Sequence, residues 1–132
     1  MAKRPIAVAL FTCEQVIFEN QTLSCTPVNC FASRVVEQVP SGPFPFVVLA
    51  LVTNGAGEIA FDLKIERLDT LEEVYQQSAT GRLRDPLREY WCLFRVRRCS
   101  LPVAASYQIL LFADGELIAQ RKLTIIAGGN AP

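Results

Sequence analysis

Turn-forming residues interrupt this sequence at short intervals, and the apolar runs between them alternate with a period of two. That period places successive side chains on opposite faces of an extended strand, whereas an amphipathic helix has a period near 3.6 residues. Short alternating strands separated by frequent turns are typical of all-β sandwiches and barrels. The sequence therefore predicts an all-β fold, a sandwich of seven to eight mostly antiparallel strands.

The clearest strands lie on either side of the segment Asn54-Gly-Ala-Gly57. The dense apolar run Phe46–Val52 predicts a central strand that is buried on both faces. In the next strand, four apolar residues alternate with polar and charged ones, so we expect them to face the core. These four residues are Ile59, Phe61, Leu63 and Ile65. Because Gly55 and Gly57 tolerate positive φ, the segment between the two strands predicts a hairpin loop.

A second hairpin is predicted near the C-terminus. Asp114-Gly115 joins the apolar runs Tyr107–Phe112 and Leu117–Ile126, and Asp-Gly between such runs is a strong signal for a two-residue turn. A strict two-residue loop places Arg121 and Ala119 on the same face, which leaves the core-facing side of the return strand undecided. A bulge in that strand would resolve the conflict.

Three more strands are predicted near Ile6–Cys13, Ser24–Val36 and Glu89–Arg97, the last with Cys92, Phe94 and Val96 inward. The capping-box pattern that begins at Asp69 and the apolar spacing after it allow one short helix near residues 70–77. An edge strand is the alternative, since Val74 and Tyr75 favour β structure.

The remaining segments are assigned by their composition. Residues 78–87 are expected to form a loop, and the proline-rich residues 38–45 a crossover loop. Residues 1–126 are expected to form a single domain, and residues 127–132 a flexible C-terminal tail.

Composition limits the chemistry of the chain. Thirteen Lys and Arg balance thirteen Asp and Glu, which lacks the basic excess of most nucleic-acid or membrane-surface binders, so nucleic acid is an unlikely partner. There is no histidine, no Gly-x-Ser-x-Gly and no phosphate loop ahead of a helix. We therefore expect a protein that is not an enzyme, with no catalytic residue, no cofactor and no metal. Cysteine-based activity ranks third among the functions considered.

Localisation follows from the N-terminal segment and the cysteines. The apolar run Ile6–Phe11 is shorter than the hydrophobic region of an export signal, and no run approaches the length of a membrane span. Five cysteines occur without a Cys-x-x-Cys pair, as expected for small buried side chains in a reducing compartment. The sequence thus predicts a cytoplasmic protein without membrane insertion.

Charge is distributed unevenly along the chain. Residues 58–73 carry six acids, including Asp62 and Glu66, against two basic residues. Residues 82–98 carry six arginines against two acids: Arg82, Arg84, Arg88, Arg95, Arg97 and Arg98. If the two segments lie side by side, they form solvated ion pairs of little energetic value. If they lie on different edges, the acidic strip of one molecule can meet the arginine strip of another and build a homo-oligomer.

The same arginines lie near Tyr90, Trp91 and Phe94, a combination that also suits single-stranded nucleic acid or a small anionic ligand. This is the alternative to the main expectation, a structural or protein-interaction module whose partner is a protein or a second copy of the chain. Reversing Asp62 and Glu66 separates the two hypotheses, because only self-assembly requires those acids.

Tyr107 opens a strand after Leu101-Pro-Val-Ala-Ala-Ser106, as in the tyrosine corner of Ig-like sandwiches. Several short strings resemble the turns of a family of small, uncharacterised bacterial proteins, from about residue 5 to residue 126. The resemblance implies an Ig-like β-sandwich and a bacterial source, and it assigns no functional residue. The strings are Cys13-Glu-Gln-Val-Ile17, Asn54-Gly-Ala-Gly-Glu58, Arg67-Leu-Asp-Thr70, Glu73-Val-Tyr75, Asp85-Pro-Leu87, Cys99-Ser-Leu-Pro102 and Ala113-Asp-Gly-Glu116.

Overall fold

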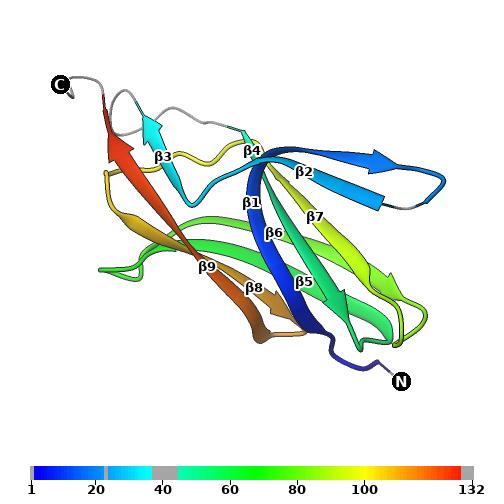
Figure 1. The fold of residues 1–132 in the computed structure, drawn as a ribbon. Coiled ribbons are helices and arrows are strands. Elements are labelled where there is room, and N and C mark those ends of the chain that lie inside the picture. Colours follow the sequence, from blue (N-terminus) through cyan, green and yellow to red (C-terminus); the bar gives the residue numbers. More distant parts are fainter. Residues whose placement is uncertain (1, 23, 37–44, 129–132) are drawn as a thin grey trace.

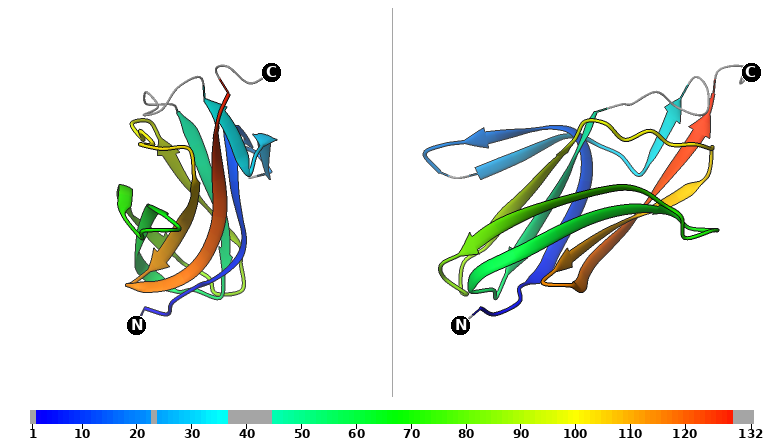
Figure 2. Two further views of the ribbon diagram at one scale, coloured as in Figure 1. Left: turned by 90° about the vertical axis from the view of Figure 1, so that its left-hand side faces the viewer. Right: turned by 180° about the vertical axis from the view of Figure 1, so that it is seen from behind.

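Two β-sheets pack face to face in the computed structural model, which describes residues 2–22, 24–36 and 45–128 (Figure 1). The described residues form nine strands and no helix. The two layers are separate along most of their length and curl toward each other along one side (Figure 2). The prediction of an all-β protein is confirmed, with nine strands in place of seven or eight.

The four-stranded sheet is antiparallel throughout and has the order β2-β1-β4-β7. Its strands are β1 (Ile6–Glu19), β2 (Ser24–Cys30), β4 (Phe46–Thr53) and β7 (Tyr90–Val96). The five-stranded sheet has the order β3-β9-β8-β5-β6, and only β3 runs parallel to its neighbour. Its strands are β3 (Ser33–Val36), β5 (Gly57–Arg67), β6 (Glu73–Leu83), β8 (Ser106–Ala113) and β9 (Glu116–Ala127).

The core lies between the two sheets and is built from alternate residues of the central strands. β4 contributes Phe46, Val48, Ala50 and Val52, and β5 contributes the four apolar residues expected from its alternation. β4 is buried on both faces, because Val47 and Leu49 are also inaccessible although they lie outside this core. The predicted environments of Phe46–Val52 and of the strand after Gly57 are confirmed.

The helix predicted near residues 70–77 is absent, and the alternative, an edge strand, is correct. β6 begins at Glu73 and pairs along its length with β5. The capping-box residues instead form the turn between these strands, in which Leu71 has φ of 61° and donates its N–H to the carbonyl of Arg67 at 2.9 Å. The partner strand β5 offers β6 a full row of hydrogen bonds, which outweighs a helical signal of only two turns. The loop predicted for residues 78–87 is wrong up to Leu83 for the same reason.

Two connections carry the chain from one sheet to the other. Asn54-Gly-Ala-Gly57 joins β4 to β5, so it is a crossover between sheets and not the predicted hairpin loop. Asn54 and Gly57 do adopt positive φ, of 66° and 86°. The strand predicted over Ser24–Val36 is likewise divided into β2 and β3. At that change of sheet, Phe31 donates its N–H to the carbonyl of Thr12 at 2.9 Å. The expected crossover at residues 38–45 falls, apart from Pro45, outside the described residues.

The C-terminal hairpin has the predicted two-residue turn and the predicted bulge. Asp114 and Gly115 have φ of 48° and 84°, and the pairs Leu111↔Ala119 and Phe112↔Leu117 leave Ile118 as the extra residue. The bulge lets Leu123 and Ile125 face the core. β9 extends to Ala127, so the expected tail begins later, and residues 129–132 lie outside the described part.

The two long sides of the sandwich differ. On one side β1 contacts β9, and the guanidinium of Arg121 on β9 donates a hydrogen bond of 3.0 Å to the carbonyl of Leu10 on β1. On the other side the edge strands β6 and β7 belong to different sheets and share no ladder. One side is therefore closed by a contact between the sheets, whereas the other is open.

Candidate interaction surfaces

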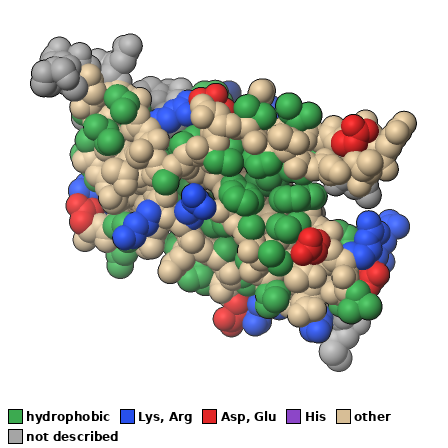
Figure 3. Space-filling view, in the orientation of Figure 1, with side chains coloured by type: hydrophobic (Ala, Val, Ile, Leu, Met, Phe, Trp, Pro, Cys, Tyr) green, Lys and Arg blue, Asp and Glu red, His purple; other side chains and the backbone are tan. Residues whose placement is uncertain are grey.

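The outer face of the four-stranded sheet, meaning the side turned away from the five-stranded sheet, is apolar. Its residues follow from the register of β1, β4 and β7: Ile6, Val8, Ala9, Phe11, Cys13, Val47, Leu49, Leu51, Trp91 and Leu93. Leu49 is fully buried between Phe11 and Leu93, whereas Val8 is 52% exposed. Figure 3 shows the hydrophobic side chains gathered on this side of the molecule. A contiguous apolar face on a soluble protein marks an interaction surface.

A two-stranded arm projects from the sandwich next to this face (Figure 1). It consists of residues 14–19 of β1 and of β2, which pair with each other after the β1–β4 ladder ends at Cys13. Ile17 is 56% exposed and Phe18 is 44% exposed. A groove of about 310 Å³ lies between the base of the arm and β7, with Glu14 on one wall and Arg95 on the other. An isolated two-stranded ribbon is marginally stable in water, so the arm gains stability from any surface that covers it.

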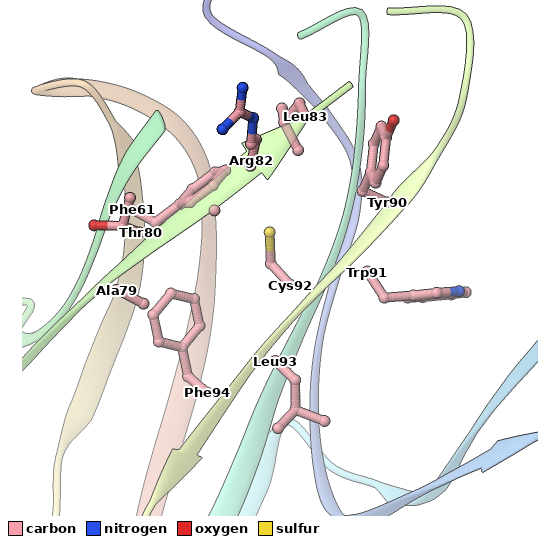
Figure 4. A pocket seen from close by; sticks show the side chains of 11 residues that line it. Phe61, Ala79, Thr80, Arg82, Leu83, Tyr90, Trp91, Cys92, Leu93 and Phe94 are labelled. Carbon is pink, nitrogen blue, oxygen red and sulfur yellow. The ribbon is translucent and has the colours of Figure 1, made fainter. Parts of the chain in front are cut away.

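A cleft of about 290 Å³ opens between β6 and β7 (Figure 4). Cys92 and Phe94 point from β7 toward Ala79 and Phe61, whereas Trp91 points the other way. The inward positions of β6 hold small residues here, because Ala79 pairs with Phe61 and Gly81 pairs with Ile59. The cleft thus leads from solvent to the side chains of the core.

The structure does not join the six arginines into one strip. Arg82, Arg84 and Arg88 lie at the end of the cleft where the chain passes from β6 to β7. Arg95, Arg97 and Arg98 lie at or beyond the other end of β7. All six side chains are exposed, and none forms a salt bridge within the described residues. Arg88 lies over the ring of Tyr90, with 5.7 Å from its guanidinium carbon to the ring centroid.

The acidic residues of the other segment are largely engaged inside the molecule. Asp62 accepts a hydrogen bond from Ser78, and Glu66 accepts one of 2.6 Å from the side-chain amide of Gln108. The Arg67 guanidinium donates hydrogen bonds to both carboxylate oxygens of Asp69, and this interaction lowers the pKa of Asp69. The neutral donors Ser78 and Gln108 orient the carboxylates of Asp62 and Glu66 and leave their negative charges in place.

Two tyrosine hydroxyls fasten the connections on either side of β7. The Tyr107 hydroxyl donates to the carbonyl of Val103 at 2.7 Å, the arrangement expected from its place after the loop. The Tyr90 hydroxyl accepts from the backbone N–H groups of Arg84 and Asp85, at 3.1 and 2.8 Å. The sequence analysis assigned no such bond to Tyr90. The two bonds to Tyr90 hold the connection between β6 and β7 at one end of the cleft, and the Tyr107 bond holds the connection that leads into β8.

The five cysteines are free thiols. Burial raises the pKa of Cys92 and the pKa of Cys99 to about 11, which keeps both thiols protonated and weakly nucleophilic at neutral pH. Cys13 and Cys30 occupy opposite positions on β1 and β2, and burial is the main cause that raises the pKa of Cys13. Across the described ranges, no group of three or more acidic or cysteine side chains is arranged to hold a metal ion.

Comparison with known proteins adds no relative: no protein-family model matches the chain, and a search of curated proteins finds no significant match. The resemblance to a bacterial family therefore stays a prediction. Among the described residues, no helix is long and apolar enough to cross a membrane. What the fold defines is an all-β protein of two facing sheets.

Sequence reasoning missed two of these surfaces. The apolar residues Ile17 and Phe18 of the arm lay outside the strands predicted near Ile6–Cys13 and Ser24–Val36, and the small residues Ala79 and Gly81 were assigned to a loop. The continuous apolar run of β4 was the available signal, because a strand buried on both faces requires a cover on each side of its sheet.

Proposed function

We propose that this protein is a non-enzymatic protein-interaction module that forms a homodimer through the outer face of its four-stranded sheet and its β1–β2 arm. One observation carries the proposal: the exposed apolar residues of β1 lie at both ends of the same strand, Ile6 and Val8 at one end and Ile17 and Phe18 in the arm. A two-fold axis brings such a surface against itself, so that each arm covers the outer face of the other copy.

The charges around this surface suit the same arrangement. Arg95 on β7 borders the outer face, and Glu19 at the tip of β1 is exposed. Neither forms a salt bridge within the described residues. When the arm of one copy lies across β7 of the other, these opposite charges approach each other at the rim, where they contribute to orientation more than to affinity. The apolar contact supplies the main driving force.

The test measures molar mass by light scattering during size exclusion, under reducing conditions and at low and high salt. The proposal expects twice the monomer mass of 14.6 kDa at both salt concentrations. The double variant Ile17→Asp/Phe18→Asp should be monomeric, and Trp91 fluorescence should shift to longer wavelength as the outer face becomes hydrated. Val35→Asp is the matched control, because Val35 is equally exposed but lies on β3 of the other sheet.

Two results separate this arrangement from the others. A wild-type protein that is monomeric at all accessible concentrations would exclude the dimer. An oligomer that dissociates at high salt, and on reversal of Asp62 and Glu66, would instead support assembly through complementary charged strips.

The strand order supports an Ig-like assignment, which we propose for the domain. β5, β8 and β9 correspond to strands C, F and G of an Ig-like sandwich, β4 and β7 correspond to strands B and E, and Tyr107 lies at the start of strand F. The proposal keeps the expectations of a bacterial, cytoplasmic protein without a cofactor. An experimentally solved structure with a different strand order would remove the assignment.

A second candidate, binding of single-stranded nucleic acid or a small anionic ligand, is favoured by the six arginines that have no salt bridge within the described residues. Their division between two ends of β7 weakens it, since a bound strand needs a continuous basic track. Fluorescence anisotropy with a labelled deoxythymidine oligomer tests the idea. Binding that is lost in Arg95→Glu/Arg97→Glu would support it, and no change in anisotropy at low salt would exclude it.

A further inference from the structure

The open side of the sandwich is a site of a different kind from the proposed dimer face. We propose that the cleft between β6 and β7 binds an extended segment of a partner protein, which adds to the free edge of β6 as a further strand. The segment carries apolar residues on its inward positions and acidic residues on its outward positions. This inference does not depend on the proposed dimer, because the guest strand pairs with β6, which the dimer leaves uncovered. The two surfaces meet only at β7, where Trp91 and Cys92 point in opposite directions.

The lining of the cleft determines the class of the occupant. Consecutive residues of both strands line it, 79–83 of β6 and 90–94 of β7, so the strand edges themselves form part of its walls. Every second residue of an edge strand directs its N–H and C=O groups away from the sheet, and burying those groups without partners costs free energy. A purely aliphatic ligand leaves them unsatisfied, whereas the backbone of an extended peptide pairs with them.

The inward side chains of the guest strand have a defined environment. On the core side of the cleft they meet Ala79, Gly81 and Cys92, three small residues, and beyond these the rings of Phe61 and Phe94. A Cβ at Gly81 would lie 3.1 Å from the ring of Phe61, so the space at this position depends on glycine. Residues of the size of valine or threonine suit such a space, and they also have high β propensity.

The outward side chains of the guest strand meet positive charge. Arg82 points from β6 toward the outer face of the five-stranded sheet, where cross-strand neighbours of a new edge strand would lie beside it. Glu58 is the cross-strand neighbour of Arg82 on β5, yet the two form no salt bridge. Arg84 likewise forms no salt bridge within the described residues, whereas the guanidinium of Arg88 lies over the ring of Tyr90. A carboxylate on the guest strand therefore meets arginines that form no salt bridge within the described residues, and it competes with Glu58 for Arg82.

The experiment titrates the full-length ¹⁵N-labelled protein, in the monomeric Ile17→Asp/Phe18→Asp background, with the synthetic peptide Thr-Glu-Val-Glu-Val-Glu-Thr. Because that background removes the dimer, failure of the dimer proposal does not affect the result. We expect saturable chemical-shift changes centred on residues 79–83 and 90–94. Alkylation of Cys92, followed by mass spectrometry, should slow when peptide is bound, while alkylation of the exposed Cys30 should not change.

Three controls address backbone pairing, charge and the space of the cleft. The same peptide N-methylated at alternate residues lacks the N–H groups for strand pairing and should not bind. The lysine counterpart of the peptide should bind at least tenfold more weakly. Among protein variants, Arg82→Glu and the cleft-filling Ala79→Leu should each weaken binding at least tenfold, whereas Arg97→Glu, an exposed arginine beyond the end of β7, should leave it unchanged.

The proposal is overturned by any of three results. The first is the absence of shift changes at millimolar peptide. The second is a set of shift changes confined to the β1 and β4 residues of the outer face, such as Phe11 and Leu49, with none at residues 79–83. The third is equal binding of the glutamate and lysine peptides, or equal binding of wild type and Arg82→Glu. Ala79 and Arg82 are both exposed on an edge strand, so neither substitution removes core packing.

Discussion

At the scale of single residues, the Tyr107 hydroxyl holds the connection before β8 through two hydrogen bonds to one residue. It donates to the carbonyl of Val103 and accepts from the N–H of the same residue at 3.3 Å. Tyr107→Phe keeps the buried ring and leaves both backbone groups of Val103 without this partner. We expect a loss of about 1–2 kcal/mol in the free energy of unfolding, measured by urea denaturation.

Tyr75→Phe is the matched control for this substitution. The Tyr75 hydroxyl donates to the side chain of Gln77, which can turn to water when the hydroxyl is removed. Its loss should therefore be smaller than that of Tyr107→Phe. Equal losses in the two variants would show that the hydroxyl of Tyr107 has no special role in holding the connection before β8.

The buried thiol of Cys99 gives the stability a defined dependence on alkaline pH. Burial raises the pKa of Cys99 from 9.0 to about 11, so the folded protein binds this proton more tightly than the unfolded chain does. The contribution, at most about 3 kcal/mol, is fully present below pH 9 and is lost as the pH rises toward 11. Cys99→Ala should have a shallower decline in the free energy of unfolding over this window.

Cys30→Ala serves as the control for the alkaline measurement, because Cys30 is exposed on β2. Cys99→Ala also lowers the free energy of unfolding at neutral pH, because it removes a buried sulfur. The quantity to compare is therefore the slope of the free energy of unfolding against pH between pH 9 and 11. A decline between pH 9 and 11 as steep in Cys99→Ala as in wild type would contradict the assignment.

At the scale of the elements, the turn of the C-terminal hairpin isolates the effect of backbone conformation. Gly115 has φ of 84°, and a Cβ at this position would meet no atom within 4 Å. Gly115→Ala therefore introduces conformational strain without a clash, and we expect it to lower the free energy of unfolding by about 1 kcal/mol. Gly115→Asn should cost less, because asparagine adopts the left-handed conformation more readily. A lower melting temperature for Gly115→Asn than for Gly115→Ala would refute this account.

The sequence correctly predicts the strands in which apolar and polar residues alternate, because that alternation alone shows which side chains are buried. β5 and the β8–β9 hairpin are of this kind. The sequence left the core-facing side of β9 undecided, and the bulge at Ile118, which alternation alone does not locate, decides it. The segment after Asp69 was predicted less well, because its helical signal and its strand signal are of similar strength. The segment becomes a strand because the edge of β5 is available to pair with it. The sequence of the segment itself contains no information about that edge.

The crossover at Asn54-Gly-Ala-Gly57 shows the same limit. Positive φ at Asn54 and Gly57 serves a sharp change of direction, and such a change occurs both in a hairpin and between sheets. Ala56 instead exchanges hydrogen bonds of 2.7 and 2.9 Å with Lys3, a residue more than fifty positions away. Contacts between residues so far apart in the sequence distinguish a crossover between sheets from a hairpin loop. Such contacts arise only in the folded chain.

At the scale of the whole molecule, the candidate surfaces depend on which strands become neighbours. The outer face is apolar because β1, β4 and β7 lie side by side, and the cleft is open because β6 and β7 end different sheets. The sequence proposed one strip of arginines and aromatics between Arg82 and Arg98, whereas the structure places the arginines toward the two ends of β7. Alternation already places Trp91 and Cys92 on opposite faces of this strand. It could not indicate that the strand is an edge of its sheet, so that the two residues serve different surfaces.

The proposed dimer makes a prediction about dynamics that involves the molecule as a whole. In a monomer, the amides of the arm should exchange with deuterium faster than those of β4 and β5, because the arm rests on no third strand. In the dimer, the partner's outer face covers the arm and slows that exchange. Hydrogen exchange measured by mass spectrometry over a dilution series should therefore show arm protection that falls as the dimer dissociates.

The edge strand β6 is the internal reference for this measurement, since the proposed dimer leaves it uncovered in both states. Its exchange should not change with protein concentration. Exchange of the arm that is equally independent of concentration, across a range in which light scattering shows dissociation, would mean that the two copies meet elsewhere. Protection of β6 at high concentration would mean that the cleft accepts a strand from a second copy, and it would place self-association at the open side of the sandwich.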